Sequence, residues 1–197
     1  MELEFESLPV TQRHVVAQKP PSFSELELFS VEAGDHDGLS EDRNSAKAIA
    51  FRQKTSDFQA SYEKSLESGD LTPAPYSYKH HFTEKHSEFG VALYGREMSV
   101  GKGAVIIGKI HKHPIMNVLL KGKLLVVSES GRRTVEAPCA YVSEPGIKKI
   151  GYVLEDCVWL NVLMTDEVGE ENLDLIISKH TAENYAELGL IDLAQKD

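Results

Sequence analysis

The feature that most constrains the fold is a series of short segments, rich in β-branched and aromatic residues, that fills residues 89–164. They read F-G-V-A-L-Y-G-R-E-M, G-A-V-I-I-G-K-I, P-I-M-N-V-L-L, K-L-L-V-V-S, R-T-V-E-A-P, C-A-Y-V-S, I-G-Y-V-L and C-V-W-L-N-V-L-M, and K-G, E-S-G-R, E-P-G and E-D stand between them. Such segments are typical of β-strands joined by tight turns. Many short strands at close spacing predict a mainly β sandwich or small barrel over residues 76–165.

The N-terminal part of the chain has a different composition and predicts different elements. Residues 1–39 mix short apolar pieces with Pro20, Pro21 and D-H-D-G, a composition that predicts an extended arm without its own core. From Ser40, a predicted N-cap, a stretch without proline predicts a long helix that ends at Gly69. Its narrow apolar stripe consists of Phe51, Thr55, Phe58, Tyr62 and Leu66. The stripe packs either on the sandwich of its own chain or on another subunit or protein.

The C-terminal part predicts a short second helix, A-E-N-Y-A-E-L, capped by Thr181 and ending at Gly189. The chain thus divides into an arm and helix (1–75), a sandwich (76–165) and a tail (166–197). Formal charge follows a similar division, with −7 for residues 1–75, +4 for 76–164 and −7 for 165–197. We therefore predict that the acidic flanks dock on the basic sandwich of their own or a neighbouring subunit, and that the chain forms a homo-oligomer.

Composition excludes several classes of function. No apolar run approaches the roughly 20 residues of a membrane span, and the acidic start M-E-L-E-F-E is unlike a signal peptide. The net charge of −10 argues against binding to nucleic acid. We expect a soluble, intracellular protein that binds neither membranes nor nucleic acids.

A few reactive residue types have simple structural interpretations. Cys139 and Cys157 form no C-x-x-C pair and lie in strand-like surroundings, which predicts reduced, inert thiols. Trp159 follows the apolar alternation of its strand and is predicted to lie in the core. The Glu155–Asp156 pair is predicted to be a solvated turn rather than an acid and base pair.

The order of these motifs resembles a known family. A strand with His111 and His113 in H-x-H, a K-G turn, an E-A-P segment, a P-G turn and a final V-W-L-N-V strand resemble the cupins over residues 78–165. This resemblance implies a double-stranded β-helix, or jelly-roll sandwich, whose interior the paired histidines line. More narrowly, K-H-H-F, Y-G-R-E-M, G-K-I-H-K-H-P, V-S-E-P-G-I-K-K-I-G-Y and L-E-D-C-V-W resemble small cupin-like proteins encoded by tailed bacteriophages. That narrower resemblance implies a location in the virion or the host cytoplasm.

Half of the cupin metal motif is replaced in this chain. The resemblance places a glutamate where Asn117 stands and a third histidine where Lys149 stands. Asparagine is a weak neutral ligand and a lysine ammonium has no lone pair, so we predict no tightly bound transition metal. His80, His81 or His86 could complete a metal set with His111 and His113, of which His81 is our chosen candidate.

Three uses of a pocket lined by His111, His113, Asn117 and Lys149 remain open. It is a divalent transition metal site, a polar core of hydrogen-bonded histidines, or a pocket for a small anion in which Lys149 replaces the charge of the metal. The first use would make the chain a metal-dependent dioxygenase, isomerase or lyase. The long arms and the degraded motif favour instead a structural or interaction protein without a cofactor, a virion or assembly component that binds other copies of itself and other phage proteins.

Overall fold

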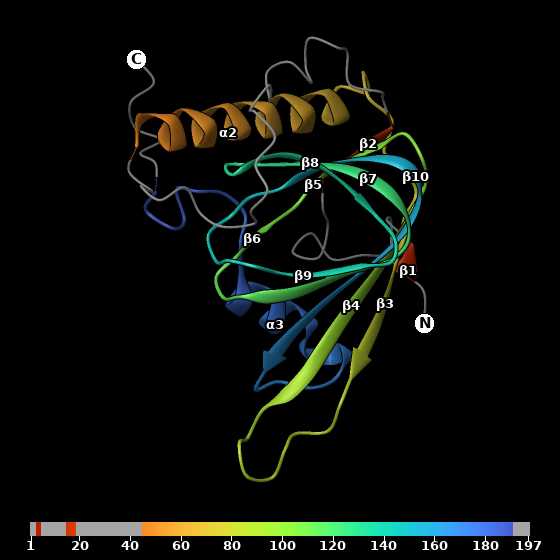
Figure 1. Ribbon diagram of the computed structural model, residues 1–197, viewed down its shortest axis with the longest axis vertical. Coiled ribbons are helices and arrows are strands. Elements are labelled where there is room, and N and C mark those ends of the chain that lie inside the picture. The colour runs from red at the N-terminus through yellow and green to blue at the C-terminus, as the bar shows by residue number, and fades with distance from the viewer. Residues whose placement is uncertain (1–2, 5–14, 19–44, 191–197) are drawn as a thin grey trace.

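The structure is a computed structural model that describes residues 3–4, 15–18 and 45–190 (Figure 1). The arm predicted over residues 1–39 lies outside the described residues, apart from strands β1 (Leu3–Glu4) and β2 (Val15–Gln18). β1 pairs with β3 (Tyr76–Phe82), and β2 pairs with β5 (Ala104–Ile107). Among the described residues, no helix is long and apolar enough to cross a membrane.

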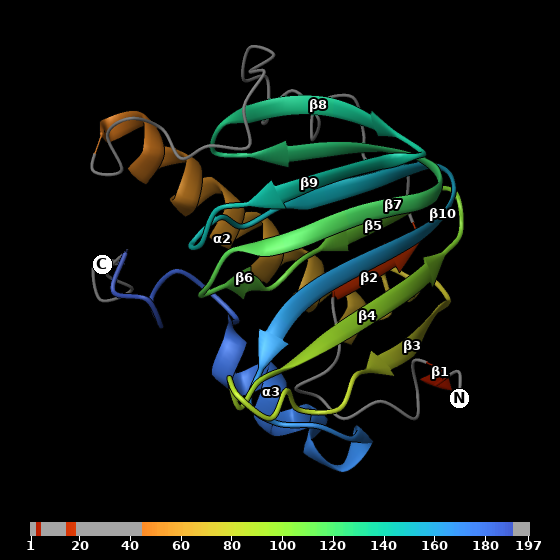
Figure 2. The ribbon, with the colours of Figure 1, turned by 60° about the horizontal axis from the view of Figure 1, so that its bottom comes forward.

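Two long strands, β7 (Ile115–Ser128) and β10 (Ile150–Thr165), organise the whole fold because a single nine-stranded sheet bends along them into two layers, called here the first and the second sheet. The first sheet contains β3, β4 (Ala92–Val100), the C-terminal half of β10, the N-terminal half of β7, and β9 (Cys139–Ser143). The second sheet contains β2, β5, the N-terminal half of β10, the C-terminal half of β7, and β8 (Gly131–Glu136). All of these pairings are antiparallel, which confirms the predicted mainly β sandwich (Figure 2).

Both long strands bend where they pass from one sheet to the other. Gly122 of β7 has φ +88°, and a Cβ added there would lie 2.2 Å from the carbonyl oxygen of Asp156 on β10. The register between the two strands also shifts twice between Glu155 and Trp159. The prediction of separate strands broken by K-G and E-D turns is therefore wrong, since both dipeptides lie within continuous strands. Glu155 and Asp156 are nevertheless exposed, as a solvated pair should be.

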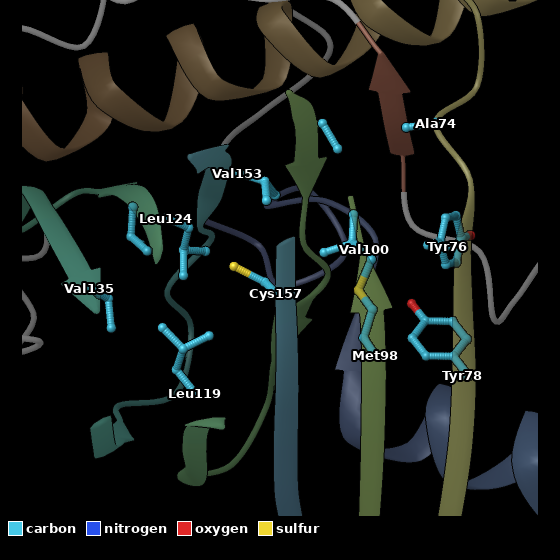
Figure 3. Packing of buried hydrophobic residues seen from close by; sticks show 12 residues of the cluster. Ala74, Tyr76, Tyr78, Met98, Val100, Leu119, Leu124, Val135, Val153 and Cys157 are labelled. Atoms are coloured by element: carbon cyan, nitrogen blue, oxygen red, sulfur yellow. The ribbon is translucent and has the colours of Figure 1, made fainter. Parts of the chain in front are cut away.

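The main core lies between the two sheets (Figure 3). Side chains alternate along each strand, so every second residue points inward and packs against the opposite sheet. The buried members are Ala74, Tyr76, Tyr78, Met98, Val100, Ala104, Leu119, Leu124, Val126, Val135, Val153 and Cys157. Trp159 packs against this cluster and is partly buried, as its alternation predicts.

The long helix α2 (Ala46–Glu67) covers the outer face of the second sheet (Figure 1). Its N-cap is Ser45, whose hydroxyl accepts a hydrogen bond from Ala48 N at 3.2 Å, whereas the predicted cap Ser40 lies outside the described residues. The predicted end at Gly69 is confirmed, since this residue follows the C-cap and has φ +80°. The apolar stripe packs on sheet residues of the same chain, namely Val105, Ile107, Val127 and Ile150.

A buried ion pair fixes α2 to the sandwich. Arg52 Nε lies 3.0 Å from Glu129 Oε2 in the β7–β8 connection, and the two side chains are 1% and 0% exposed. The Arg52 guanidinium also lies 5.6 Å from the ring centroid of Tyr185, near the end of the described chain. The pair thus ties together the helix, the hairpin and the C-terminal segment.

The C-terminal segment differs from the prediction. The helix there is α3 (Leu173–His180), preceded by the short 3-10 helix η3 (Glu170–Asn172), and residues 183–189 form bends and turns instead. Thr181 is the C-cap of α3 rather than an N-cap, and it begins strand β11 (Thr181–Ala182), which pairs with β6 (Ile110–His111). The apolar face of α3 packs on the first sheet, because Leu173 and Ile176 cluster with Tyr94. The three-part division of the chain stays a prediction.

Candidate functional site

A cavity of about 100 Å³ opens between the two sheets beside β6 and the β9–β10 connection. Its lining combines a group of apolar side chains, called here the floor, with a group of polar side chains, of which Lys109, Asn117 and Ser143 are buried. The floor consists of Met98, Val100, Ile106, Leu124, Val126 and Cys157, and the polar side chains are Lys109, His111, Asn117, Tyr141, Ser143, Glu144, Lys149 and Asn161. Three of the four residues predicted to line a pocket, His111, Asn117 and Lys149, therefore meet in one cavity.

A row of polar residues crosses the inner face of the first sheet beside this cavity. Strand register pairs His80 with Arg96, Arg96 with Asn161, Asn161 with Asn117, and Asn117 with Tyr141. Because cross-strand partners face the same side of a sheet, all five side chains point inward. An inner face with so many polar groups is unusual for a sandwich core and indicates a use beyond packing.

Asn117 is the fully hydrogen-bonded member of this row and is 2% exposed. Its amide nitrogen donates to Ser143 Oγ at 2.6 Å and lies 3.4 Å from the carbonyl oxygen of Tyr141. Its amide oxygen accepts a hydrogen bond from Asn161 Nδ2 at 3.0 Å. With its oxygen engaged in this way, Asn117 orients Ser143 and Asn161 and is a poor ligand for a metal.

Lys149 supplies a positive charge at the rim of the cavity. Its ammonium donates a hydrogen bond to Ser143 Oγ and lies 4.8 Å from the ring centroid of Tyr141, a cation–π distance. Ser143 Oγ thus accepts from both Asn117 and Lys149. Because a hydroxyl has two lone pairs and one hydrogen, its own hydrogen is left to donate to a third group such as a ligand oxygen.

His111 lies between the cavity and the first sheet, at the pairing of β6 with β11. Burial, aided by the charges of Arg96 and Lys149, lowers the pKa of His111 to about 3. The imidazole is therefore neutral at physiological pH, with one nitrogen that donates and one that accepts. It makes no hydrogen bond within the described part of the chain, so both nitrogens are open to a ligand or water.

The other predicted histidines lie elsewhere. His113 is exposed, does not line the cavity, and contacts the ring of His180 at 5.5 Å between centroids. His81 lies on the outer face of the first sheet beside Gly95 and pairs with Glu97 Oε2 at 3.0 Å. His80 points inward, with Nδ1 2.8 Å from the hydroxyl of Tyr94, and burial lowers its pKa to about 4. The structure therefore does not bring His81 or His113 together with His111 in one pocket.

The donor set of the cavity does not fit a transition metal. In the described ranges, no three His, Cys, Asp or Glu side chains are grouped closely enough to hold one. At the cavity itself, His111 is the one imidazole ligand, the oxygen of Asn117 is engaged, and Lys149 adds a positive charge. A divalent cation in this cavity would meet repulsion and too few ligands.

The thiol at the cavity floor is not a nucleophile. Burial raises the pKa of Cys157 to about 11, which keeps the sulfur protonated. Its Sγ donates instead toward backbone carbonyl oxygens, including that of Glu155 at 3.0 Å. The cavity thus offers a neutral imidazole, a hydroxyl donor and a cation above an apolar floor, a combination suited to binding a small anion.

Comparisons with known proteins concern only part of the chain. Similar solved structures include a cupin-like protein from Thermotoga maritima, at 14% identity over 50% of this chain and 81% of that chain, with a TM-score of 0.37. A predicted oxalate decarboxylase from the same organism is 12% identical over 46% of this chain and 80% of that chain, with a TM-score of 0.38. A cupin-2 domain containing protein from Shewanella frigidimarina is 12% identical over 43% and 78%, with a TM-score of 0.34. No protein-family model and no curated protein matches the chain.

Sequence reasoning missed Arg96, Ser143 and Asn161. A signal for two of them was present, because Arg96 and Asn161 occupy inward positions of alternating strands in which the other inward residues are largely apolar. A polar residue at such a position requires a partner or a function. The sequence does not show which residues of the two strands pair, so it could not reveal that Arg96 and Asn161 are neighbours.

Proposed function

We propose that the chain is a cupin-like sandwich that binds a small carboxylate in its cavity, with the Lys149 ammonium taking the role of a metal ion. One observation carries this proposal: Lys149 and the neutral His111 share a cavity whose one described carboxylate, Glu144, is exposed at the rim. An anion there gains the attraction of the Lys149 ammonium and accepts a hydrogen bond from the Ser143 hydroxyl. The apolar floor accommodates the hydrocarbon part of the ligand.

The size of the cavity limits the ligand. A closed apolar cavity of about 150 Å³ holds benzene, so a volume near 100 Å³ encloses roughly four heavy atoms. Acetate has this size, and slightly longer acids such as lactate or pyruvate extend through the open rim. We expect the carboxylate to lie at Lys149 and Ser143, and any oxygen on the next carbon to accept a hydrogen bond from His111.

A thermal-shift screen with formate, acetate, pyruvate and lactate tests this assignment. Binding to the native state raises the unfolding temperature in proportion to the logarithm of ligand concentration over Kd. We expect at least one acid to raise it in the natural chain and the effect to fall by tenfold or more in apparent affinity for Lys149→Met. The exposed Lys102→Met is the matched control, and equal responses of both variants would contradict the proposal.

A second candidate function is binding to another protein, and the outer face of the first sheet favours it. Leu93, Met116, Leu120, Val142 and Met164 are each at least 49% exposed there. Val142 pairs with Met116, and Met164 pairs with Leu93, so four of these side chains form two cross-strand apolar pairs on this face. Contiguous exposed apolar surfaces mark interaction sites.

A second copy of the chain is the partner that this outer face fits. The chain carries a net charge of −10, so most of its surface repels a second copy. These five side chains are uncharged and can contact the same five side chains of a second copy without charge repulsion. Light scattering of the full chain should give a dimer, and Met116→Lys should give a monomer with unchanged carboxylate binding. A natural chain that is monomeric at all concentrations would remove this candidate. A role of such a dimer in a virion is part of the same proposal.

A further inference from the structure

Arg96 is a buried cation for which the described part of the chain supplies no acidic partner. Its side chain points inward from β4, and the residue is 5% exposed. The guanidinium lies 5.3 Å from the ring centroid of Tyr78, which provides a cation–π contact, but it makes no hydrogen bond or ion pair with any described residue. A buried charge without a counter-charge is costly, and natural proteins rarely keep one.

A second, separate void lies beside Arg96 under helix α3. Its volume is about 10 Å³, close to what a single water or a monatomic ion requires. The residues with polar side chains around it are Tyr94, Arg96, His111, Asn161, His180 and Thr181. All of these residues are cationic or neutral, and no carboxylate lines the void within the described chain.

His180 provides an independent sign of a missing partner. It is 9% exposed, and its Nε2 is buried without a hydrogen-bond partner in the described structure. Asp166 is the acidic group whose charge acts on His180, but its carboxylate is exposed and pairs with Lys179. The void therefore has a guanidinium on one side and an unused imidazole nitrogen on another.

We propose that this void is a binding site for a monatomic anion, chloride in the cell, that neutralises Arg96 and accepts a hydrogen bond from His180. The void is too small for a carboxylate or sulfate, which separates this site from the larger cavity at Lys149. Because α3 supplies His180 and the sheet supplies Arg96 and Asn161, the anion would join α3 to the first sheet. The two sites share His111 and Asn161 in their linings but differ in their cations, Arg96 here and Lys149 in the larger cavity.

The unfolding temperature in sodium chloride, bromide and sulfate at equal ionic strength tests this site. Sulfate ordinarily stabilises folded proteins more than the halides do. We expect the reverse order for the natural chain, with a midpoint about 5 °C higher in saturating halide. Arg96→Met should restore the ordinary order, whereas Lys149→Met and the exposed Arg132→Met should keep the halide preference.

Crystals of the natural chain grown in bromide keep the proposal testable if Arg96→Met does not fold. An anomalous scattering peak between Arg96 and His180 is the expected result. No peak at that position, together with an ordinary salt order for the natural chain, would show that the void holds water and would overturn the proposal.

Discussion

At the scale of single residues, the site depends on which groups are charged. His111 is neutral because burial, and next the charges of Arg96 and Lys149, lower the pKa of its imidazole. A neutral imidazole donates and accepts hydrogen bonds without adding a third positive charge to the cavity. The same burial makes His111 a source of acid sensitivity for the whole fold.

The free energy of unfolding should therefore fall as the pH falls below the pKa of an ordinary histidine. The pKa of His111 is about 3 in the folded chain and near 6.5 when unfolded, so its contribution is complete above pH 6.5 and is lost progressively below it. We expect His111 to add up to about 1.4 kcal/mol per pH unit to the slope of unfolding free energy between pH 6 and pH 4. Urea unfolding across this range should show a shallower slope for His111→Asn. An unchanged slope relative to the loop variant His86→Asn would contradict this explanation.

At the scale of elements, two features hold the sandwich in shape: the bend shared by β7 and β10, and the ion pair between α2 and the β7–β8 connection. Glycine at position 122 allows both a positive φ and a close approach to Asp156. Sequence patterns treat such a glycine as a turn because local residue types do not show that pairing continues past it. The E-D dipeptide on β10 was also predicted to be a turn, although it lies within a continuous strand.

Gly122→Ala should destabilise the chain by roughly 2–5 kcal/mol, since the added carbon meets backbone 2.2 Å away and the backbone is left-handed. Gly103→Ala is the matched control, because Gly103 has φ +86° but a Cβ added there would meet no atom within 4 Å. Chemical denaturation should show a clearly larger loss for Gly122→Ala. Equal losses would mean that left-handed strain alone matters at the bend.

The buried ion pair should behave differently from an exposed one. Arg52→Met leaves Glu129 buried without a partner and should cost about 3–5 kcal/mol of unfolding free energy. The double variant Arg52→Met, Glu129→Leu should recover much of that loss, because the buried charge is then removed as well. Lys123→Met, which breaks the exposed pair with Glu136, should have little effect. A small effect of Arg52→Met in the same urea titrations would contradict the structural role of the pair.

At the scale of the whole molecule, the sequence predicted the sandwich and the body of α2 because both rest on strong periodic patterns. It also predicted that His111, Asn117 and Lys149 lie together, through the resemblance to cupins. It missed α3, whose apolar face spans only two turns, and the polar row through Arg96 and Asn161, which exists only once strand register is known. Partners far apart in sequence, such as Arg52 and Glu129, leave no local pattern at all.

Carboxylate binding in the cavity should depend on Lys149 and not on a metal. Isothermal titration of the best carboxylate from the screen, into the untagged full chain with and without EDTA, tests it most directly. We expect the same Kd in both buffers and at least tenfold weaker binding to Lys149→Met. Binding that disappears in EDTA and persists in Lys149→Met would contradict it and restore a metal to the site.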